Sequence, residues 1–445
     1  MSSPFYREFS RRDLMKIGLA SACGVSYSGW LPRLARAAAE QNKPRACIVL
    51  WMSGGPTQTD TFDLKPDHAN GGPFKPIETA VSGIKISEHL PGLAEQMKDM
   101  AIIRGMKTAE GDHGRGTQLM LTGYRPGNAA VRYPSLGSLV AKEVGIRDNE
   151  LPNYVSLSSF QFAPNVNGAG FLGPQFAPLV VSGNSDNPQA RANLSIDNLK
   201  LPLGVDEESM KRRVGVLNFL QRGFTSQTTN ESAKAHKANY ERAVRMVESQ
   251  AKHAFRLDEE TNELRDKYGR NRFGQGCLLA RRLVERGVPF VEVALSRVNN
   301  NPVSWDTHSD NFNRVRELSG VLDPAWATLM DDLRDRGLLD STLIVWMGEF
   351  GRTPTINTNG GGGRDHFPAA WSTVLAGGLI KGGQVIGDTG NDGMEVINQP
   401  VSTKDLYATI CSAMGIDHEG ENISTEGRPI RIVDEGGTPI KELVG

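Results

Sequence analysis

The chain has 445 residues, a formal net charge of -1, 38% hydrophobic residues and 23% charged residues. This length and composition fit a folded protein with one large α/β domain or two ordinary domains. The near-zero net charge gives no electrostatic footprint for nucleic acid, so we expect no nucleic-acid partner. No apolar run is long enough to cross a bilayer, so we also expect no stable membrane span.

The first 39 residues carry the pattern of an export signal. Ser10-Arg11-Arg12-Asp13-Leu14-Met15-Lys16 resembles the twin-arginine consensus, a modestly apolar stretch follows, and Ala37-Ala38-Ala39 supplies small residues for cleavage. The alternative is an amphipathic helix with a chance arginine pair, but the complete order of parts favours the signal. We therefore expect residues 1–39 to be a twin-arginine signal peptide, the twin-arginine translocase to be a partner, and the mature protein to be periplasmic or secreted.

The mature part alternates short apolar runs with helical patterns. The expected strands are 45–52, 100–106, 288–295, 342–347 and 370–375. The expected helices are 90–97, 113–122, 322–336 and 404–414, with a strongly helical segment at about 206–286. Residues 152–203 are rich in Pro, Asn, Ser and Gly, which predicts a surface excursion. This alternation favours one domain over 45–435, a three-layer α/β/α sandwich with a mostly parallel central sheet and a helical insertion.

Acidic and histidine side chains gather in four segments that follow expected strands. The candidates in these segments are Asp60, His113, Arg115, Asp306, His308, Glu349, Arg352, Asp365 and His366. Sites in parallel sheets form in the loops beyond the carboxyl ends of the strands. Carboxylates bind hard divalent cations, and imidazole nitrogens bind zinc-like ions. The shared location of three histidines is therefore the main argument for a metal site.

The spacing within two of these segments suggests roles. Asp306 and His308 are two positions apart, so both could reach one ion from the same side of an extended segment. Asp365 could be a further ligand or could orient the adjacent imidazole of His366. Arg352 could bind an anionic oxygen in a bidentate way.

A structural role is the alternative interpretation for each segment. Ser309 or Asp310, for example, could simply cap a helix that begins near Asn311. Taken singly, each of the four segments is more often structural than catalytic.

Two stretches resemble sulfatases. Residues 337–351 resemble the sulfatase segment in which a strand ends at metal ligands; on that match Glu349 takes a ligand position and Phe350 replaces a second ligand. Leu121-Thr122-Gly123-Tyr124-Arg125-Pro126 resembles the end of the sulfatase nucleophile helix, which places the nucleophile position on or near His113.

The whole mature chain, from about 45 to 430, more closely resembles the DUF1501 family, twin-arginine-exported bacterial proteins of the alkaline phosphatase-like superfamily. The motifs that carry the resemblance include Gly54-Gly55-Pro56, Trp305-Asp306-Thr307-His308, Glu349-Phe350-Gly351-Arg352-Thr353-Pro354 and Gly363-Arg364-Asp365-His366. The resemblance implies an alkaline phosphatase-like fold and a metal-dependent hydrolase of phosphate or sulfate esters, with a small-molecule or polysaccharide ester as substrate.

The resemblance also implies roles for individual residues. It would make Asp306, His308, Glu349 and His366 ligands of a divalent ion such as zinc or calcium, with Asp60 and Asp365 as further candidates. It would place His113 at the catalytic position, with Arg352 or Arg115 holding the anion.

The chain departs from the sulfatase pattern at two positions. No Ser, Thr or Cys occupies the nucleophile position, and Phe350 removes a ligand. The attacking group is then a water activated by the metal or a histidine, or hydrolysis has been lost. The alternative functions are a non-catalytic binding or assembly protein that retains the fold, or a protein whose metal is purely structural.

Overall fold

The computed structural model describes residues 46–127, 131–146, 149–157, 168–183, 250–296 and 304–444, with isolated pairs at 194–195, 208–209, 212–213 and 215–216. The expected signal peptide, 1–39, lies outside these residues, as do residues 217–249 of the expected helical segment 206–286. Within the described ranges, no helix is both long enough and apolar enough to cross a membrane.

The centre of the fold is an eight-stranded sheet with the order β14-β4-β13-β10-β1-β9-β5-β6. Its strands are β1 (Ala46–Met52), β4 (Met100–Met106), β5 (Tyr154–Ser156), β6 (Leu179–Val180), β9 (Phe290–Leu295), β10 (Thr342–Met347), β13 (Trp371–Gly377) and β14 (Gln384–Ile386). Strand β13 runs antiparallel to both of its neighbours, and the other pairings in this sheet are parallel. The expected mostly parallel sheet is confirmed.

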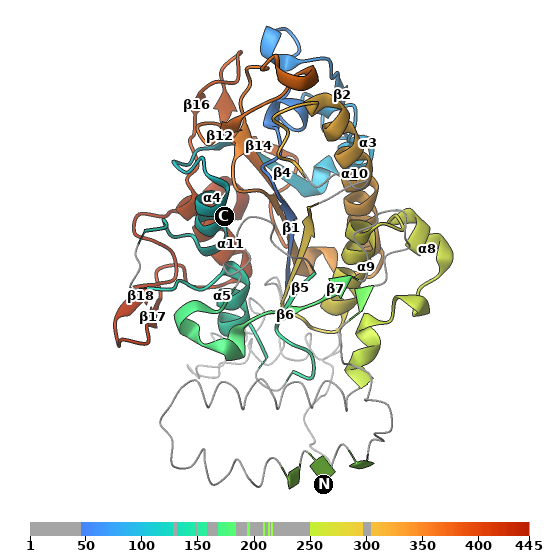
Figure 1. The fold of residues 1–445 in the computed structure, drawn as a ribbon, viewed down its shortest axis with the longest axis vertical. Coiled ribbons are helices and arrows are strands. Elements are labelled where there is room, and N and C mark those ends of the chain that lie inside the picture. Colours follow the sequence, from blue (N-terminus) through green and yellow to red (C-terminus); the bar gives the residue numbers. More distant parts are fainter. Residues whose placement is uncertain are drawn as a thin grey trace, which may run out of the picture. The chain divides into compact units, whose positions relative to one another are not determined.

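Helices cover both faces of this sheet (Figure 1). One face carries α3 (Pro91–Glu95), α9 (Arg272–Glu285) and α10 (Asn311–Asp335), and the other carries α4 (His113–Thr122), α5 (Leu136–Glu143), α11 (Thr403–Met414) and α12 (Lys441–Val444). Strand β1 shows why two layers are needed, because it is buried on both faces. Ile48 packs in the first core and Cys47 in the second. The three-layer sandwich is therefore confirmed.

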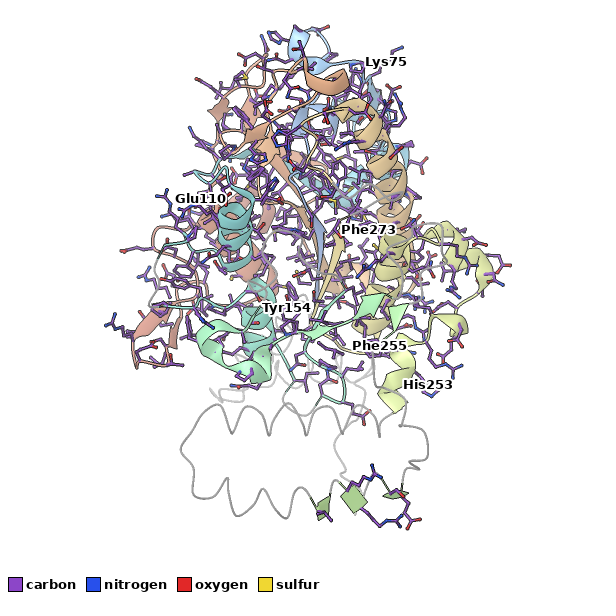
Figure 2. The ribbon with its side chains drawn as sticks, viewed as in Figure 1. Lys75, Glu110, Tyr154, His253, Phe255 and Phe273 are labelled. Atoms are coloured by element: carbon purple, nitrogen blue, oxygen red, sulfur yellow. The ribbon has the colours of Figure 1, made fainter. Side chains whose placement is uncertain are left out.

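Figure 2 labels one residue from each core, Phe273 of α9 and Tyr154 of β5. Phe273 belongs to the core under α9 and α10, and Tyr154 belongs to the core under α4, α5 and α11. Both side chains are almost fully buried.

Smaller elements surround the sheet. They are α8 (Asn262–Lys267) and the strand pairs β2 (Pro76–Glu78) with β3 (Lys85–Ser87), β7 (Ser182–Gly183) with β8 (Leu194–Ser195), β11 (Gly351–Arg352) with β12 (His366–Phe367), β15 (Asp388–Thr389) with β16 (Val396–Asn398), and β17 (Glu421–Ile423) with β18 (Pro429–Arg431). The β11–β12 pair matters for function, because it places Arg352 directly opposite His366.

Two expectations from the sequence need correction. Part of the stretch 152–203 is not a surface excursion, because β5 and β6 within it form one edge of the main sheet. The helix expected at 322–336 begins at Asn311 and continues through Pro324. The residues before the proline bury an apolar face at helical spacing, for example Val315, Leu318 and Leu322, and this packing outweighs the one backbone donor that proline lacks.

Candidate metal centre

Four loops meet beyond the carboxyl ends of β1, β4, β9 and β10, and glycines allow their close contact. Gly54 has a φ of +104°, and a Cβ atom there would lie 2.4 Å from the backbone nitrogen of Asp306. A Cβ atom on Gly363 would lie 1.8 Å from the carbonyl oxygen of His308. The Gly-Gly-Pro and Gly-Arg-Asp-His motifs therefore keep glycine at these two positions so that the chains carrying Asp306 and His308 can pack against them.

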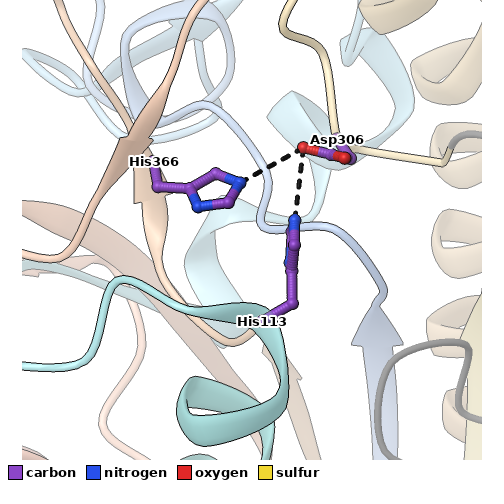
Figure 3. A group of neighbouring side chains, drawn as sticks. All are labelled: His113, Asp306 and His366. Carbon is purple, nitrogen blue, oxygen red and sulfur yellow. Dashed lines mark ion pairs between the residues drawn. The ribbon is translucent and has the colours of Figure 1, made fainter.

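Three imidazoles converge on one carboxylate oxygen, Oδ1 of Asp306. The Nε2 atom lies 3.3 Å from this oxygen in His113, 3.1 Å in His308 and 3.4 Å in His366. The Nε2 atoms of His308 and His366 are 3.0 Å apart. Figure 3 shows His113 from the start of α4 and His366 from β12 aimed at Asp306. The ligand atoms of His113, Asp306 and His366 lie within 4.8 Å of one another, so these three side chains could hold a metal ion.

Local structure places His113 at the first turn of α4. The Asp112 side chain caps the helix by accepting from the backbone N–H of Arg115, and Gly123, with a φ of 77°, ends it. The imidazole therefore projects from the start of a helix whose length and orientation are fixed at both ends.

Each imidazole is fixed at its other ring nitrogen, Nδ1. The partners are Glu349 Oε1 for His113 at 2.7 Å, Asp365 Oδ1 for His308 at 2.6 Å, and the Gly111 carbonyl oxygen for His366 at 2.7 Å. Carboxylates and carbonyl groups that hold Nδ1 are the usual second layer around metal-binding histidines, because they set the tautomer and the ring orientation.

These partners decide where the protons lie. A carbonyl oxygen can only accept, so Nδ1 of His366 must carry the proton, and Nε2 of the neutral ring presents a lone pair. The same reasoning applies to His308 beside the carboxylate of Asp365. Two lone pairs 3.0 Å apart, facing an anionic oxygen, repel one another unless a cation or a proton lies between them.

The donor spacing fits a metal ion. Nitrogen and oxygen ligands at about 2.0–2.2 Å from a tetrahedral ion lie roughly 3.3–3.6 Å apart. The contacts of His113 and His366 with Asp306, at 3.3 and 3.4 Å, lie in this range, whereas the contacts of His308 with Asp306 and with His366, at 3.1 and 3.0 Å, are shorter. Donor type, proton placement and spacing therefore agree with a divalent-ion site formed by His113, Asp306 and His366, with His308 beside Asp306 and His366 as a further candidate ligand.

The charges of the cluster shift the pKa values of its members. Burial alone would lower the pKa of His113, but hydrogen bonds with Asp306 and Glu349 outweigh burial and raise the pKa to about 9. Burial would raise the pKa of Asp306, but His113, His366 and Arg352 hold it well below its usual range. The site therefore favours an ionised aspartate and, without a metal, a protonated imidazole.

Arg352 lies inside the protein rather than in an open pocket. Its fully buried guanidinium contacts Asp306 Oδ1 at 2.6 Å and also donates to the backbone oxygens of Gly54, Gly55 and Arg364. Each of its nitrogens thus donates to the protein. This arrangement orients Asp306 and does not present a free fork to an anionic substrate.

Two other candidates have partners away from the imidazoles. Asp60 is fully buried and forms a bidentate ion pair with Arg364, at 2.7 and 2.8 Å. Thr57 and Asn311 also donate to its Oδ2 atom. Asp60 is therefore saturated by protein donors.

Arg115, also a candidate, lies in the first turn of α4, two residues after His113. It binds the carboxylate of Glu110 with two nitrogens, at 2.7 and 3.0 Å, while its side chain remains half exposed. It is the candidate anion-holding arginine that solvent can reach.

Glu349 and Asp365 lie in the cluster, each bound to a histidine. Oε1 of Glu349 also accepts the backbone N–H of Gly54 at 2.8 Å, while its buried Oε2 atom has no hydrogen-bond partner among the described residues. Asp365 orients His308 and not its sequence neighbour His366. Adjacent residues of an extended segment point to opposite sides, which accounts for this difference.

Some residues of the site were not predicted from the sequence. The carbonyl oxygen of Gly111, which fixes His366, leaves no mark on residue type. Arg364, which binds Asp60, could have been noticed as the basic residue of the Gly-Arg-Asp-His motif. Asp310, proposed as a helix cap, does precede α10, but its side chain makes no capping hydrogen bond and accepts from Asn313 instead.

Several solved structures are similar to the chain. The sulfatase PsFucS1 from Pseudoalteromonas sp. shares 15% identity over 87% of this chain and 70% of its own, with a TM-score of 0.40. The alkaline phosphatase from the Antarctic bacterium TAB5 shares 12% over 79% of this chain and 96% of its own, with a TM-score of 0.36. The lipoteichoic acid synthase LtaP from Listeria monocytogenes shares 10% over 91% and 76%, with a TM-score of 0.38.

The comparison with curated proteins found no match. The model of one family, described as "Protein of unknown function (DUF1501)", matches residues 44–444, which include every residue of the cluster. The chain belongs to the DUF1501 family.

Proposed function

We propose that this protein is a metal-dependent hydrolase of phosphate or sulfate esters. The observation that carries the proposal is the convergence of three imidazole Nε2 atoms on Asp306 Oδ1, each ring fixed at Nδ1 by an acceptor. The resemblance of the sequence to sulfatases supplies the class of ester. A bound divalent ion would polarise the ester and activate the attacking group.

The protein's own residues supply the rest of the chemistry. Asp306 and the imidazoles of His113, His308 and His366 would hold the ion. Glu349 accepts from Nδ1 of His113 and so keeps its Nε2 atom directed at Asp306. Because both nitrogens of His113 face carboxylates, this residue is poorly placed as a nucleophile, and the arrangement favours an attacking water.

The exposed side of the cluster indicates where an ester would bind. The exposed fraction is 45% for the His308 side chain and 25% for His366, but only 13% for His113. Substrate would therefore approach past His308 and His366. Arg115 follows Gly111 and His113 in the chain and is the arginine that could hold an anionic group on this side.

One observation favours a second candidate function, a binding or assembly protein that has lost hydrolysis. The buried ring of Phe350 stands 5.0 Å from the His113 ring and 4.7 Å from the His366 ring, where a second ligand is expected from the resemblance. The absence of a Ser, Thr or Cys at His113 points the same way.

Metal analysis of the purified, folded protein tests the proposal first. We expect a divalent metal in the wild type and a large loss of metal in His308→Ala. Glu349→Ala removes the acceptor that fixes Nδ1 of His113, so we expect this variant to lose metal as well. His253→Ala is the matched control, because His253 pairs with Glu259 far along the chain from the cluster. A wild type without bound metal would end the metallo-hydrolase proposal.

Activity is then measured on generic phosphomonoesters, phosphodiesters and sulfate esters. We expect turnover of at least one class, abolished by a chelator and in His308→Ala. Metal binding without turnover of any class would favour the binding or assembly protein instead.

Export through the twin-arginine pathway is part of the proposal. It is supported by the order of the signal elements in residues 1–39. We expect replacement of both Arg11 and Arg12 by lysine to keep the full-length protein in the cytoplasm, as judged by cell fractionation. Unchanged export of this variant would contradict the assignment.

A further inference from the structure

The inner side of the metal centre is closed by two residues. Arg352 contacts Asp306 Oδ1 at 2.6 Å through a guanidinium that is fully buried. The fully buried Phe350 ring packs against the rings of His113 and His366, and the Arg352 guanidinium lies 5.9 Å from its centre. The Asp306 oxygen that all three imidazoles face is therefore already in contact with one fixed positive charge, that of Arg352. The hydrocarbon ring of Phe350 covers the space beside the imidazoles.

We infer that the centre holds a single divalent ion and that Arg352 supplies the positive charge which a second ion would otherwise bring. This inference rests on the proposed function, because it assumes that the cluster binds metal.

The formal charges balance with one ion. Three carboxylates belong to the cluster, those of Asp306, Glu349 and Asp365, and among the described residues the one guanidinium in direct contact is that of Arg352. Two negative charges remain, and one divalent cation neutralises them. A second divalent cation would leave two positive charges in a partly buried space, which is costly.

The donors also suffice for only one ion. All three imidazoles face the same oxygen, so none is left for a second ion. The buried carboxylate oxygen without a partner among the described residues, Oε2 of Glu349, is a single donor. The Phe350 ring offers no donor at all, whereas divalent ions in proteins usually have at least three protein ligands.

A balanced centre implies a preference among esters. A sulfate ester or a phosphodiester carries one negative charge, whereas a phosphate monoester carries up to two near neutral pH, since its second pKa is about 6. With one ion and an arginine already committed to Asp306, the centre is neutral, so a bound dianion leaves two uncompensated negative charges and a monoanion leaves only one. We therefore expect monoanionic esters as the substrate class.

Titration of chelator-treated, full-length protein with Co²⁺ tests the ion count. We expect calorimetry and the visible absorption of bound cobalt to reach an end point at one equivalent. An end point at two equivalents would overturn the inference and leave the proposed function intact. No binding at all would overturn the proposed function itself.

Two substitutions test the part assigned to Arg352. Arg352→Met removes the fixed charge, and we expect it to take up a second, weaker equivalent of Co²⁺, whereas Arg352→Lys should stay at one. Arg334→Met is the control for loss of a positive charge, since Arg334 pairs with Asp99 and Asp331 on the surface. Circular dichroism checks folding. A folded Arg352→Met that binds one equivalent with unchanged affinity would overturn this part, and the wild-type end point decides the ion count if the variant does not fold.

Comparison of three chromogenic esters tests the substrate preference. We expect kcat/KM for 4-nitrophenyl sulfate or bis(4-nitrophenyl) phosphate to exceed that for 4-nitrophenyl phosphate at least tenfold at pH 8. A reversed preference would overturn the charge argument. No turnover of any ester would count against the proposed function while the cobalt end point still decides the ion count.

Discussion

Asp60 and Asp306 are both acidic residues beyond the ends of strands, yet their surroundings differ. Asp60 is enclosed by Arg364, Thr57 and Asn311, whose donors satisfy both of its oxygens and whose charge balances its own. Asp306 instead faces three imidazoles whose Nδ1 atoms are already bound elsewhere. The first is a closed ion pair, and the second is a group of imidazoles and a carboxylate that a cation or a proton would complete.

The difference shows how a structural carboxylate can be told from a ligand. Residue type and position in the loop are the same in both cases. What separates them is the direction of the neighbouring groups. Donor groups directed at Asp60 satisfy both of its oxygens, whereas the imidazoles beside Asp306 direct lone pairs at the space that its Oδ1 atom also faces. Substitutions at the two sites should therefore have opposite signatures.

The largest expected effect is on stability, at the closed pair. Asp60→Ala leaves the buried guanidinium of Arg364 without its partner, which should cost about 3–5 kcal/mol of unfolding free energy. Urea denaturation of the metal-free protein measures it, with Asp340→Ala, an exposed aspartate, as the control. If Asp60→Ala unfolded at the same urea concentration as the wild type but no longer bound metal, Asp60 would be a ligand and not a structural ion-pair partner.

Removal of the ion should have the next largest effect. A ligand present at about 100–1,000 times its Kd stabilises the folded state by roughly 2.7–4.1 kcal/mol, so a chelator should lower the unfolding free energy by a similar amount. Asp306→Asn should abolish this response, whereas folded Asp60→Ala should keep it. Thermal unfolding with and without a chelator decides between the two, and an equal response in both variants would contradict our assignment of roles.

A smaller effect is expected from the second layer of the centre. Asp365→Asn weakens the acceptor that fixes Nδ1 of His308, and such changes usually lower metal affinity by about 10–100-fold. Competition with a chromogenic chelator measures the affinity, and Asp340→Asn serves as the matched control. Affinity within twofold of the wild type would show that Asp365 does not position His308.

A third buried carboxyl, Glu292, sharpens the comparison because, among the residues that the structure describes, it has neither an ion pair nor imidazoles around it. Tyr154 and Ser156 donate to it at 3.0 and 3.3 Å, and burial raises its pKa from 4.5 to about 8. Between these two values the folded state binds more protons than the unfolded state, so stability should fall as the pH rises, by about 1.4 kcal/mol per unit at most.

Glu292→Gln should flatten this slope. Denaturation of the metal-free protein at several pH values across this window measures the slope. The unfolding free energy of the variant should rise relative to that of the wild type towards alkaline pH. An identical slope in both proteins would show that Glu292 is already ionised in the folded state.

Much of the fold could be predicted because apolar runs and turn residues fix the strands locally. Strands β4 and β10 have the predicted bounds, 100–106 and 342–347, since each is a buried run of residues next to polar or glycine-containing loops. Strands β5 and β6 could not be predicted, because they are short and lie in a stretch rich in turn-forming residues. Only their pairing with β9 and with each other defines them.

The candidate site was predictable as a neighbourhood but not as a set of contacts. The spacing of Asp306 and His308 predicted that both side chains point to the same side of the segment, and His308 Nε2 does lie 3.1 Å from Asp306 Oδ1. The ion pair of Asp60 could not be predicted, because Arg364 is 304 positions away in the chain. The same is true of Arg352, whose burial among backbone oxygens depends on the packing of four loops.

The hydrogen bond between Gly111 and His366 joins positions 255 residues apart, so the ring of His366 takes its orientation only when two distant stretches of the chain have folded against each other. An unfolded polypeptide therefore has no preformed place to collect an ion. The cell compartment in which folding finishes would then decide which metal is loaded, because that compartment sets which ions are available at that moment. If the twin-arginine route carries this protein across the membrane already folded, the cytoplasmic metal pool selects the ion before the protein meets the ions outside.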